Sequence, residues 1–227
     1  MEEVMKKFCL AIGLAGVLAA PTLQAAMSGQ ITLSTGPNSV GGGEFVATGL
    51  GGLSSLGTFS SFCLEHNEYF NPGGTYNATV NDRTISGGVA TSGAPGSDPL
   101  SMGTAWLYSN FRAGTLAGYN SGLTATAGQL QNAIWWLEGE ITTSQAANPF
   151  ILQIPNNLGW RDYNSAVDAN GAWGVVALNL TYPNGGRAQD QLALVPTPVP
   201  EPTTMIAGVL LLLPFAASTF RRLRRKA

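Results

Sequence analysis

Residues 173–195 read WGVVALNLTYPNGGRAQDQLALV, and this stretch decides the expected fold. Its first half, residues 173–182, alternates between apolar and polar positions and is rich in valine and leucine, as a half-buried β-strand is. Asn184, Gly185 and Gly186 supply a turn, and residues 189–195 then return as a second apolar strand. The stretch therefore predicts a β-hairpin close to the end of the globular part of the chain.

The N-terminal third of the chain carries further strand patterns, at residues 28–33, 45–47, 58–64 and 75–80. Within residues 58–64, the alternation of side chains along a strand places Phe62 and Leu64 on one face. Ser61 and Cys63 are expected on the opposite face.

The middle of the chain favours helices instead. Asp98 and Pro99 suit the N-cap and the first position of a helix, and Thr126 with Gln129 fits a capping box for the next one. Further helices are expected from Asn148 and over residues 161–169. Strands followed by helices and again by strands predict the α+β class, as a β-sandwich or barrel-like domain with an inserted helical block.

Both ends of the chain look like targeting segments. Residues 1–26 have a basic start, an apolar stretch and small residues at the end, which predicts a cleaved signal peptide. Residues 203–220 carry no charge and predict a transmembrane helix. A Pro-rich linker, 196–202, precedes this helix, and a basic tail, 221–227, follows it on the expected cytoplasmic side. The mature extracellular domain would then span residues 27–195.

The C-terminal segment resembles the PEP-CTERM sorting signal. It contains the tripeptide Pro200-Glu201-Pro202, the apolar segment and a basic cluster that includes Arg221, Arg222, Arg224 and Arg225. The resemblance implies an exosortase as a partner, and export through the inner membrane of a Gram-negative bacterium that makes exopolysaccharide. It further implies a final location at the cell surface, in the outer membrane or in the extracellular matrix, where polysaccharide or a surface ligand would be the partner.

Charge and cysteine content limit the partners that the protein can bind and the cross-links that it can form. Residues 27–195 hold ten acidic residues, four arginines and no lysine, which gives a net charge of −6. This charge argues against nucleic acid and anionic lipid as partners. Cys63 is the single cysteine left after removal of the signal peptide, so the mature chain has no internal disulfide.

Two short segments resemble the thioester (TQXA) domains of bacterial surface adhesins. The first is FCLE at residues 62–65, and the second is LQNAIW at residues 130–135. The resemblance implies a bond between the sulfur of Cys63 and the side-chain carbonyl of Gln131, formed with loss of ammonia. Such a bond would attach the protein covalently to an amine or a hydroxyl on a partner, and the absence of lysine agrees with it.

The surroundings of this bond follow from the same segments. Gln131 is expected in the second turn of its helix, where the positive end of the helix dipole would lower the pKa of a nearby thiol. Phe62 and Trp135 would exclude water, Ala133 lies in the same motif, and His66 would assist proton transfer. Glu138, seven residues after Gln131 on the same helix face, would reach the same cleft or form a solvated acidic rim.

Other interpretations stay open at this stage. Cys63 is alternatively a buried core residue and Gln131 a surface residue, in a non-covalent structural or polysaccharide-binding matrix protein, for which Trp160 and Trp173 are candidate sugar contacts. A hydrolase that uses Cys63 and His66 is the weakest alternative, because a third residue to orient the base is not evident. The sequence predicts no metabolic enzyme, no metal site and no cofactor.

Overall fold

The structure is a computed structural model that describes residues 27–41, 43–85, 98–155 and 167–195. The predicted signal peptide, the Pro-rich linker, the transmembrane helix, the basic tail and Trp160 lie outside the described residues. The same holds for the sorting-signal residues Pro200, Glu201, Pro202, Arg221, Arg222, Arg224 and Arg225. The residues described for the globular part hold no helix with the length and apolar character that crossing a membrane requires.

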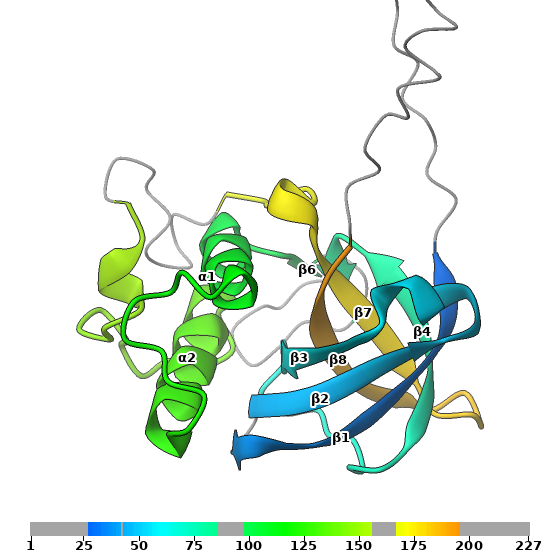
Figure 1. The fold of residues 1–227 in the computed structure, drawn as a ribbon. Helices are drawn as coiled ribbons and strands as arrows, with labels where there is room; N and C mark the ends of the chain where they lie inside the picture. The colour runs from blue at the N-terminus through cyan, green and yellow to red at the C-terminus, as the bar shows by residue number, and fades with distance from the viewer. Residues whose placement is uncertain (1–26, 42, 86–97, 156–166, 196–227) are drawn as a thin grey trace, which may run out of the picture.

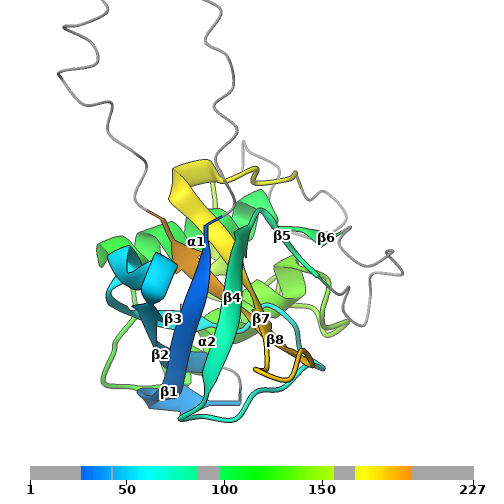
Figure 2. The ribbon, with the colours of Figure 1, turned by 90° about the vertical axis from the view of Figure 1, so that its right-hand side faces the viewer.

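A six-stranded antiparallel sheet dominates the domain (Figures 1 and 2). Its strands, in spatial order, are β3 (Thr58–Phe62), β2 (Gly43–Leu50), β1 (Ser28–Val40), β4 (Thr75–Asn81), β7 (Val175–Thr181) and β8 (Arg187–Leu194). The predicted hairpin is confirmed, because β7 and β8 pair antiparallel around residues 182–186. The predicted strands at residues 28–33, 45–47 and 75–80 all belong to this sheet, although β1 and β2 are longer than expected. The strand predicted at residues 58–64 is shorter, because β3 ends at Phe62.

The two edge strands of the sheet approach each other. An isolated antiparallel bridge joins Cys63, just after β3, to Gln191 in β8. The backbone N–H of Leu64 donates to the carbonyl of Asp190 at 3.0 Å, so the contact is hydrogen-bonded. The Tyr108 hydroxyl also bonds the carbonyls of both edges, Ser60 at 2.9 Å and Leu192 at 3.1 Å. We call this meeting line of β3 and β8 the seam.

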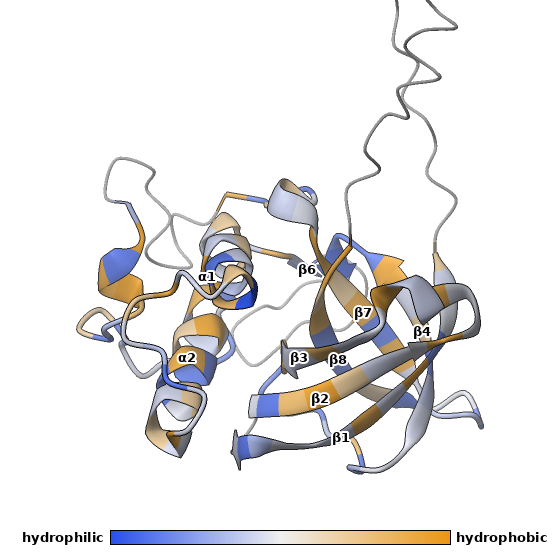
Figure 3. Ribbon diagram, in the orientation of Figure 1, coloured by the Kyte–Doolittle hydropathy of each residue, from blue (hydrophilic) through white to orange (hydrophobic). Residues whose placement is uncertain are grey.

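The curled sheet separates two apolar clusters. One face encloses a cluster of buried side chains that includes Ile31, Leu33, Phe59, Tyr76, Leu178 and Leu180. The other face carries Phe62 and Leu64 into a second cluster, which it shares with the helices. Phe62 and Leu64 thus share a face, as the alternation predicts, and Cys63 belongs to a different cluster. Figure 3 shows the hydrophobic stretches along the strands and helices.

Two helices cover one side of the sheet: α1 (Met102–Ala113) and α2 (Thr124–Leu137) (Figure 1). The short helices are η1 (Gly51–Leu56), η2 (Ile151–Gln153) and η5 (Ala172–Gly174). β5 (Arg83–Thr84) and β6 (Asp98–Pro99) form a separate two-stranded sheet. The predicted α+β class is therefore confirmed, with α1 and α2 between β4 and β7 in the chain.

The predicted helix starts are wrong at both main helices. Asp98 and Pro99 pair with β5 instead of capping α1, and Ser101 is the N-cap, because its Oγ accepts from the Thr104 N–H at 3.1 Å. Helix α2 begins at Thr124 with Leu123 as N-cap. Thr126 lies inside its first turn and bonds the Asn120 backbone. Tertiary pairing and a loop contact thus override the local capping signals.

Two smaller helix predictions have mixed outcomes. Asn148 Oδ1 accepts from the Phe150 N–H at 3.0 Å, and the short helix η2 begins only at Ile151. Residues 161–166 of the predicted fourth helix lie outside the described residues. Residues 167–169 are not helical, since Asp168 forms an isolated bridge with Ser101.

Candidate functional site

Cys63 lies at the seam and is fully buried. The chain reaches this position because β3 ends at Phe62, after which Cys63 bridges to Gln191 on the opposite edge. Phe45 and Trp135 form a small apolar cluster with Cys63. Water is thereby kept away from the sulfur by β2 on one side and α2 on the other.

Gln131 reaches the same point from the middle of α2. Its side chain is 1% exposed, and its amide pairs with the backbone of Cys63 in both directions. The Cys63 N–H donates to Gln131 Oε1 at 3.0 Å, and Gln131 Nε2 donates to the Cys63 carbonyl at 2.8 Å. The structure therefore brings together the two residues that the sequence singled out.

A second glutamine amide contacts the sulfur itself. Gln191 Nε2 lies 3.2 Å from Cys63 Sγ and donates to it. Ser61 Oγ donates to Gln191 Oε1 at 3.0 Å, and lies 2.7 Å from the Leu192 carbonyl. Ser61 thereby orients the Gln191 amide toward the thiol, while the Gln131 amide bonds the backbone of the same cysteine.

Sequence reasoning missed Gln191. The sequence predicts the hairpin that contains Gln191. Whether this residue meets Cys63 depends on how far the sheet curls, and the strand pattern does not encode that. The one available signal was the polar run Gln189-Asp190-Gln191 in a strand that ends apolar, because buried side chains of this kind need hydrogen-bond partners.

Burial raises the pKa of the Cys63 thiol well above its usual range. The hydrogen bond from Gln191 lowers this pKa, but by less than burial raises it. The charge of Glu65 adds to the increase. The expected depression of the pKa by the helix dipole is therefore wrong. Gln131 lies about two turns inside α2, whereas the dipole effect is confined to the first turn. Desolvation in an apolar enclosure outweighs it.

Two buried carboxyl groups lie beside the thiol along the seam. Glu65 Oε2 accepts from the Asp190 N–H at 3.3 Å. Asp190 accepts from the backbone of Leu180 at 2.8 Å and from Asn179 Nδ2 at 2.7 Å. Burial raises the pKa of Glu65, and the neighbouring charge of Asp190 raises it further. Burial also raises the pKa of Asp190. Glu65 is therefore expected to be neutral near pH 7.

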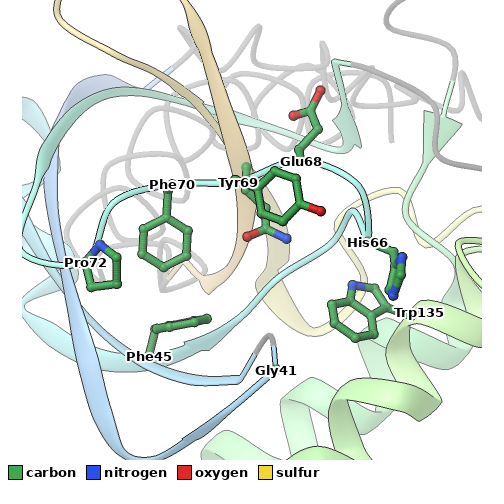
Figure 4. Close-up of a pocket in the computed structure, with 9 residues that line it drawn as sticks. Gly41, Phe45, His66, Glu68, Tyr69, Phe70, Pro72 and Trp135 are labelled. Carbon is green, nitrogen blue, oxygen red and sulfur yellow. The ribbon is translucent and has the colours of Figure 1, made fainter.

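A pocket of about 350 Å³ opens next to this buried cluster (Figure 4). Phe45 and Trp135, which enclose Cys63, also line the pocket. Tyr69, Phe70, His66 and Glu68 complete most of its wall. The pocket and the thiol are thus separated by the two rings that both of them contact.

The remaining predicted residues have different positions. His66 is exposed, and its backbone N–H donates to Glu140 Oε2 at 2.9 Å. Its ring packs edge-on against Trp135, with ring centroids 4.7 Å apart. Ala133 is buried in the helix cluster, and so is Phe62, which contacts Phe111. Phe62 therefore faces the helices, away from the pocket side of Cys63.

Glu138 is neither a cleft residue nor part of a solvated rim. It is buried, and its Oε1 accepts from the Ser101 hydroxyl at 2.6 Å and from the Ser101 N–H at 3.2 Å. The carboxyl group therefore ties the end of α2 to the start of α1. Burial raises its pKa to about 7.

The described residues contain no group of histidine, cysteine and acidic side chains arranged to hold a metal ion. Comparisons of the chain with known protein families, with curated proteins and with solved structures found no match.

Proposed function

We propose that this is an exported cell-surface or matrix protein that attaches to its partner through an internal thioester between Cys63 and Gln131. In forming the bond, Cys63 Sγ attacks the side-chain carbonyl carbon of Gln131, the C–N bond breaks, and the thiol proton leaves with the amide nitrogen as ammonia. A partner amine or hydroxyl later attacks the same carbon, and the sulfur leaves as a thiol.

The observation that carries this proposal is the pairing of the Gln131 amide with the Cys63 backbone, at 2.8 and 3.0 Å, in a fully buried site. Holding two reactants in register converts a bimolecular step into an intramolecular one. The enclosure by Phe45 and Trp135 supports it further, since a thioester must be protected from water until its partner arrives. The absence of lysine from residues 27–195 removes the most reactive internal competitor.

The buried acids give the mechanism a proton donor. Glu65 lies two residues from Cys63 in the chain and is expected to be neutral, so we propose that it passes its proton to the nitrogen that leaves and takes up the proton of the Cys63 thiol in return. Gln191 is proposed as a positioning residue, because its amide donates to the sulfur and is itself oriented by Ser61.

The barrel-like form that the sequence suggested belongs to this proposal. What supports it is the meeting of β3 and β8 at Cys63 and Gln191, which puts the reactive pair on the closing line of the sheet. A bond from position 63 to position 131 would lock this line from the helix side.

The sorting route is proposed on the C-terminal sequence alone. The tripeptide at 200–202, the uncharged segment 203–220 and the basic residues after it support recognition by an exosortase and transient membrane anchoring. Replacement of Glu201 by alanine should then leave the protein in the inner membrane. Normal surface display of that variant would argue against exosortase sorting.

The test of the thioester is the intact mass of the exported protein, prepared without amine buffers. A mass lower by one ammonia than the calculated value is expected, and the deficit should vanish in Cys63→Ala and in Gln131→Ala. Incubation with methylamine should convert the deficit into a methylamide on Gln131. A full calculated mass, together with a thiol that alkylates after unfolding, would overturn the thioester.

The second candidate function is a non-covalent polysaccharide-binding matrix protein with a buried thiol. The observation that favours it is the hydrogen bond from Gln191 to Cys63 Sγ, which satisfies the sulfur as a plain core residue. Matrix retention that is unchanged in Cys63→Ala would favour this candidate. A hydrolase dyad gains no support, because the His66 ring packs on Trp135 and the thiol is bonded by Gln191.

A further inference from the structure

The pocket beside Cys63 contains a hydrogen-bond donor without an acceptor. The indole N–H of Trp135 is buried and has no hydrogen-bond partner among the described residues. Trp135 lines the pocket with 6% of its surface exposed. Because a buried donor that lacks an acceptor costs free energy, an acceptor oxygen brought next to Trp135 would stabilise this wall of the pocket.

The pocket wall is aromatic and comes from three separate segments. Phe45 belongs to β2, Tyr69 and Phe70 to the loop after Cys63, and Trp135 to α2 (Figure 4). Phe45 and Phe70 pack edge-to-face with ring centroids 4.6 Å apart, which fixes that side of the wall. Tyr69 is 78% exposed, so its ring is available to cover a ligand at the mouth.

The polar groups at the mouth complement such a ligand. Glu68 lines the pocket and offers carboxylate acceptors, and the exposed His66 ring is held against Trp135. A volume of about 350 Å³ lies at the lower end of the range for small-molecule sites, which suits a ligand of the size of one sugar ring.

We propose that this pocket binds a single neutral pyranose ring of a glycan. A sugar hydroxyl accepts from the Trp135 N–H and donates to Glu68, while the C–H face of the ring lies against the aromatic wall. An ammonium group satisfies Glu68 but has no lone pair to offer the indole N–H. The unpaired donor therefore favours a sugar over a lysine side chain.

The position of the pocket gives the sugar a second role. Phe45 and Trp135 form both its floor and the cover of Cys63, so a bound glycan lies directly over the buried thiol. For a sugar hydroxyl to attack the Gln131 carbonyl carbon, forming an ester as the proton passes to the Cys63 sulfur, the Phe45 and Trp135 rings that separate the two must first move aside. This covalent step rests on the proposed thioester, whereas the binding of the sugar stands on the pocket alone.

The binding test uses the full chain, purified in detergent and first treated with methylamine to open any thioester. The probes are glucose, galactose, mannose and N-acetylglucosamine, with lysine as the cationic competitor, and binding is measured by saturation-transfer NMR titration. At least one sugar is expected to bind, and lysine is expected not to displace it.

Three variants separate the contributions of the pocket residues. Tyr69→Ala should weaken sugar binding about tenfold, the size of one good aromatic contact. Trp135→Phe keeps a ring but loses the N–H, and should weaken binding by about threefold to tenfold. Trp173→Ala is the control for the place of binding. The sequence offers Trp173 as a sugar contact too, but this residue, with 48% exposure, does not line the pocket, so sugar binding by the variant should stay at the wild-type level.

The proposal is overturned if no sugar binds, if lysine binds in place of the sugars, or if Trp173→Ala weakens binding as much as Tyr69→Ala. The covalent step is measured separately, by the intact mass of protein that has been incubated with the binding sugar but not with methylamine. Sugar binding without a mass increase would retain the pocket and reject the covalent step. A methylamine adduct without sugar binding would retain the thioester and reject the pocket.

Discussion

The side chain of Gln131 pairs with the backbone of Cys63 as a neighbouring strand would, with the Cys63 N–H donating at 3.0 Å and the Cys63 carbonyl accepting at 2.8 Å. The two residues are 68 positions apart in the sequence, and one of them lies on a helix. This contact therefore links α2 to the seam of the sheet and satisfies two backbone groups that would otherwise be buried without partners. It gives Gln131 a structural role in the unreacted chain, whereas in the thioester the Nε2 donor has left as ammonia and only the Oε1 acceptor remains.

Replacing Gln131 by alanine should accordingly destabilise the domain. The variant leaves the N–H and the carbonyl of Cys63 buried without partners, at a cost of about 1–3 kcal/mol for each group. If the wild type carries the thioester, loss of a cross-link over this loop costs roughly 4 kcal/mol in the chain-entropy model. The free energy of unfolding in urea measures the effect.

Gln129→Ala provides the control for that measurement. Gln129 lies on the same helix with its side chain exposed, so its replacement should change the free energy of unfolding by no more than about 0.5 kcal/mol. Equal stability of the two variants would show that the amide of Gln131 contributes nothing to the seam.

The intact mass of variants distinguishes the role of Gln191 from that of Gln131. Gln191→Met keeps an unbranched side chain of similar length but removes the amide that donates to Cys63 Sγ. We expect this variant to retain the ammonia deficit, since the proposed acyl group belongs to Gln131. Loss of the hydrogen bond should lower stability by about 1 kcal/mol.

The opposite mass pattern would reassign the acyl donor. A deficit that persists in Gln131→Ala and disappears in Gln191→Met would mean that the sulfur bonds the glutamine whose amide already contacts it. Circular dichroism spectra like that of the wild type are needed for both variants, so that a lost deficit is not a sign of unfolding.

The extent to which the sequence anticipates this site depends on the range of the interactions. The hairpin and the strand before Cys63 follow from local alternation, and the structure confirms both. The encounter of Cys63 with Gln131 was expected only through a resemblance in two short segments. Its geometry, an amide against a backbone, is set by the packing of α2 on the sheet, and no local pattern carries that information.

The wrong predictions of the helix caps and of the thiol pKa have the same origin. Asp98 and Thr126 are good capping residues by type, but Asp98 pairs with β5 and the Thr126 hydroxyl bonds the Asn120 backbone. The thiol pKa was expected to fall through a helix dipole and instead rises through burial, because the closing of the seam determines how much solvent reaches Cys63. Long-range contacts decided each of these outcomes.

Gly43 offers a steric test of the packing around Gln131. A Cβ at this position would collide with the Phe62 ring and lie 3.0 Å from Gln131 Oε1. Gly43→Ala should therefore force β2 and α2 apart and cost about 1–3 kcal/mol, as overpacking of a dense core does. A thermal melt of the purified protein would measure this loss.

Gly128→Ala is the matched substitution within α2. A Cβ there meets no atom within 4 Å, and the residue is in a helix interior, so the change should stabilise the protein by about 0.5–1 kcal/mol. Opposite shifts of the melting temperature are expected for the two variants. A Gly43→Ala protein as stable as wild type would mean that the contact between β2 and α2 is looser than described.

Stability should increase as the pH falls from about 8 to about 5. Burial raises the pKa of Glu138 from 4.5 to about 7, and burial also raises those of Glu65 and Asp190. A carboxyl group with a raised pKa in the folded state binds its proton more tightly when folded. Its contribution is complete below the unfolded pKa and is lost as the pH rises through the folded value.

Glu138→Gln isolates one part of this dependence. The glutamine retains an Oε1 acceptor for the Ser101 hydroxyl and N–H, and it cannot ionise. Between pH 5 and pH 8 the free energy of unfolding of the variant should therefore fall less steeply than that of the wild type. The difference in slope, at most about 1.4 kcal/mol per pH unit for a single proton, is measured by urea titrations at several pH values. Identical slopes would mean that Glu138 is ionised in the folded protein, with its charge stabilised by the N-terminus of α1 and not neutralised by burial.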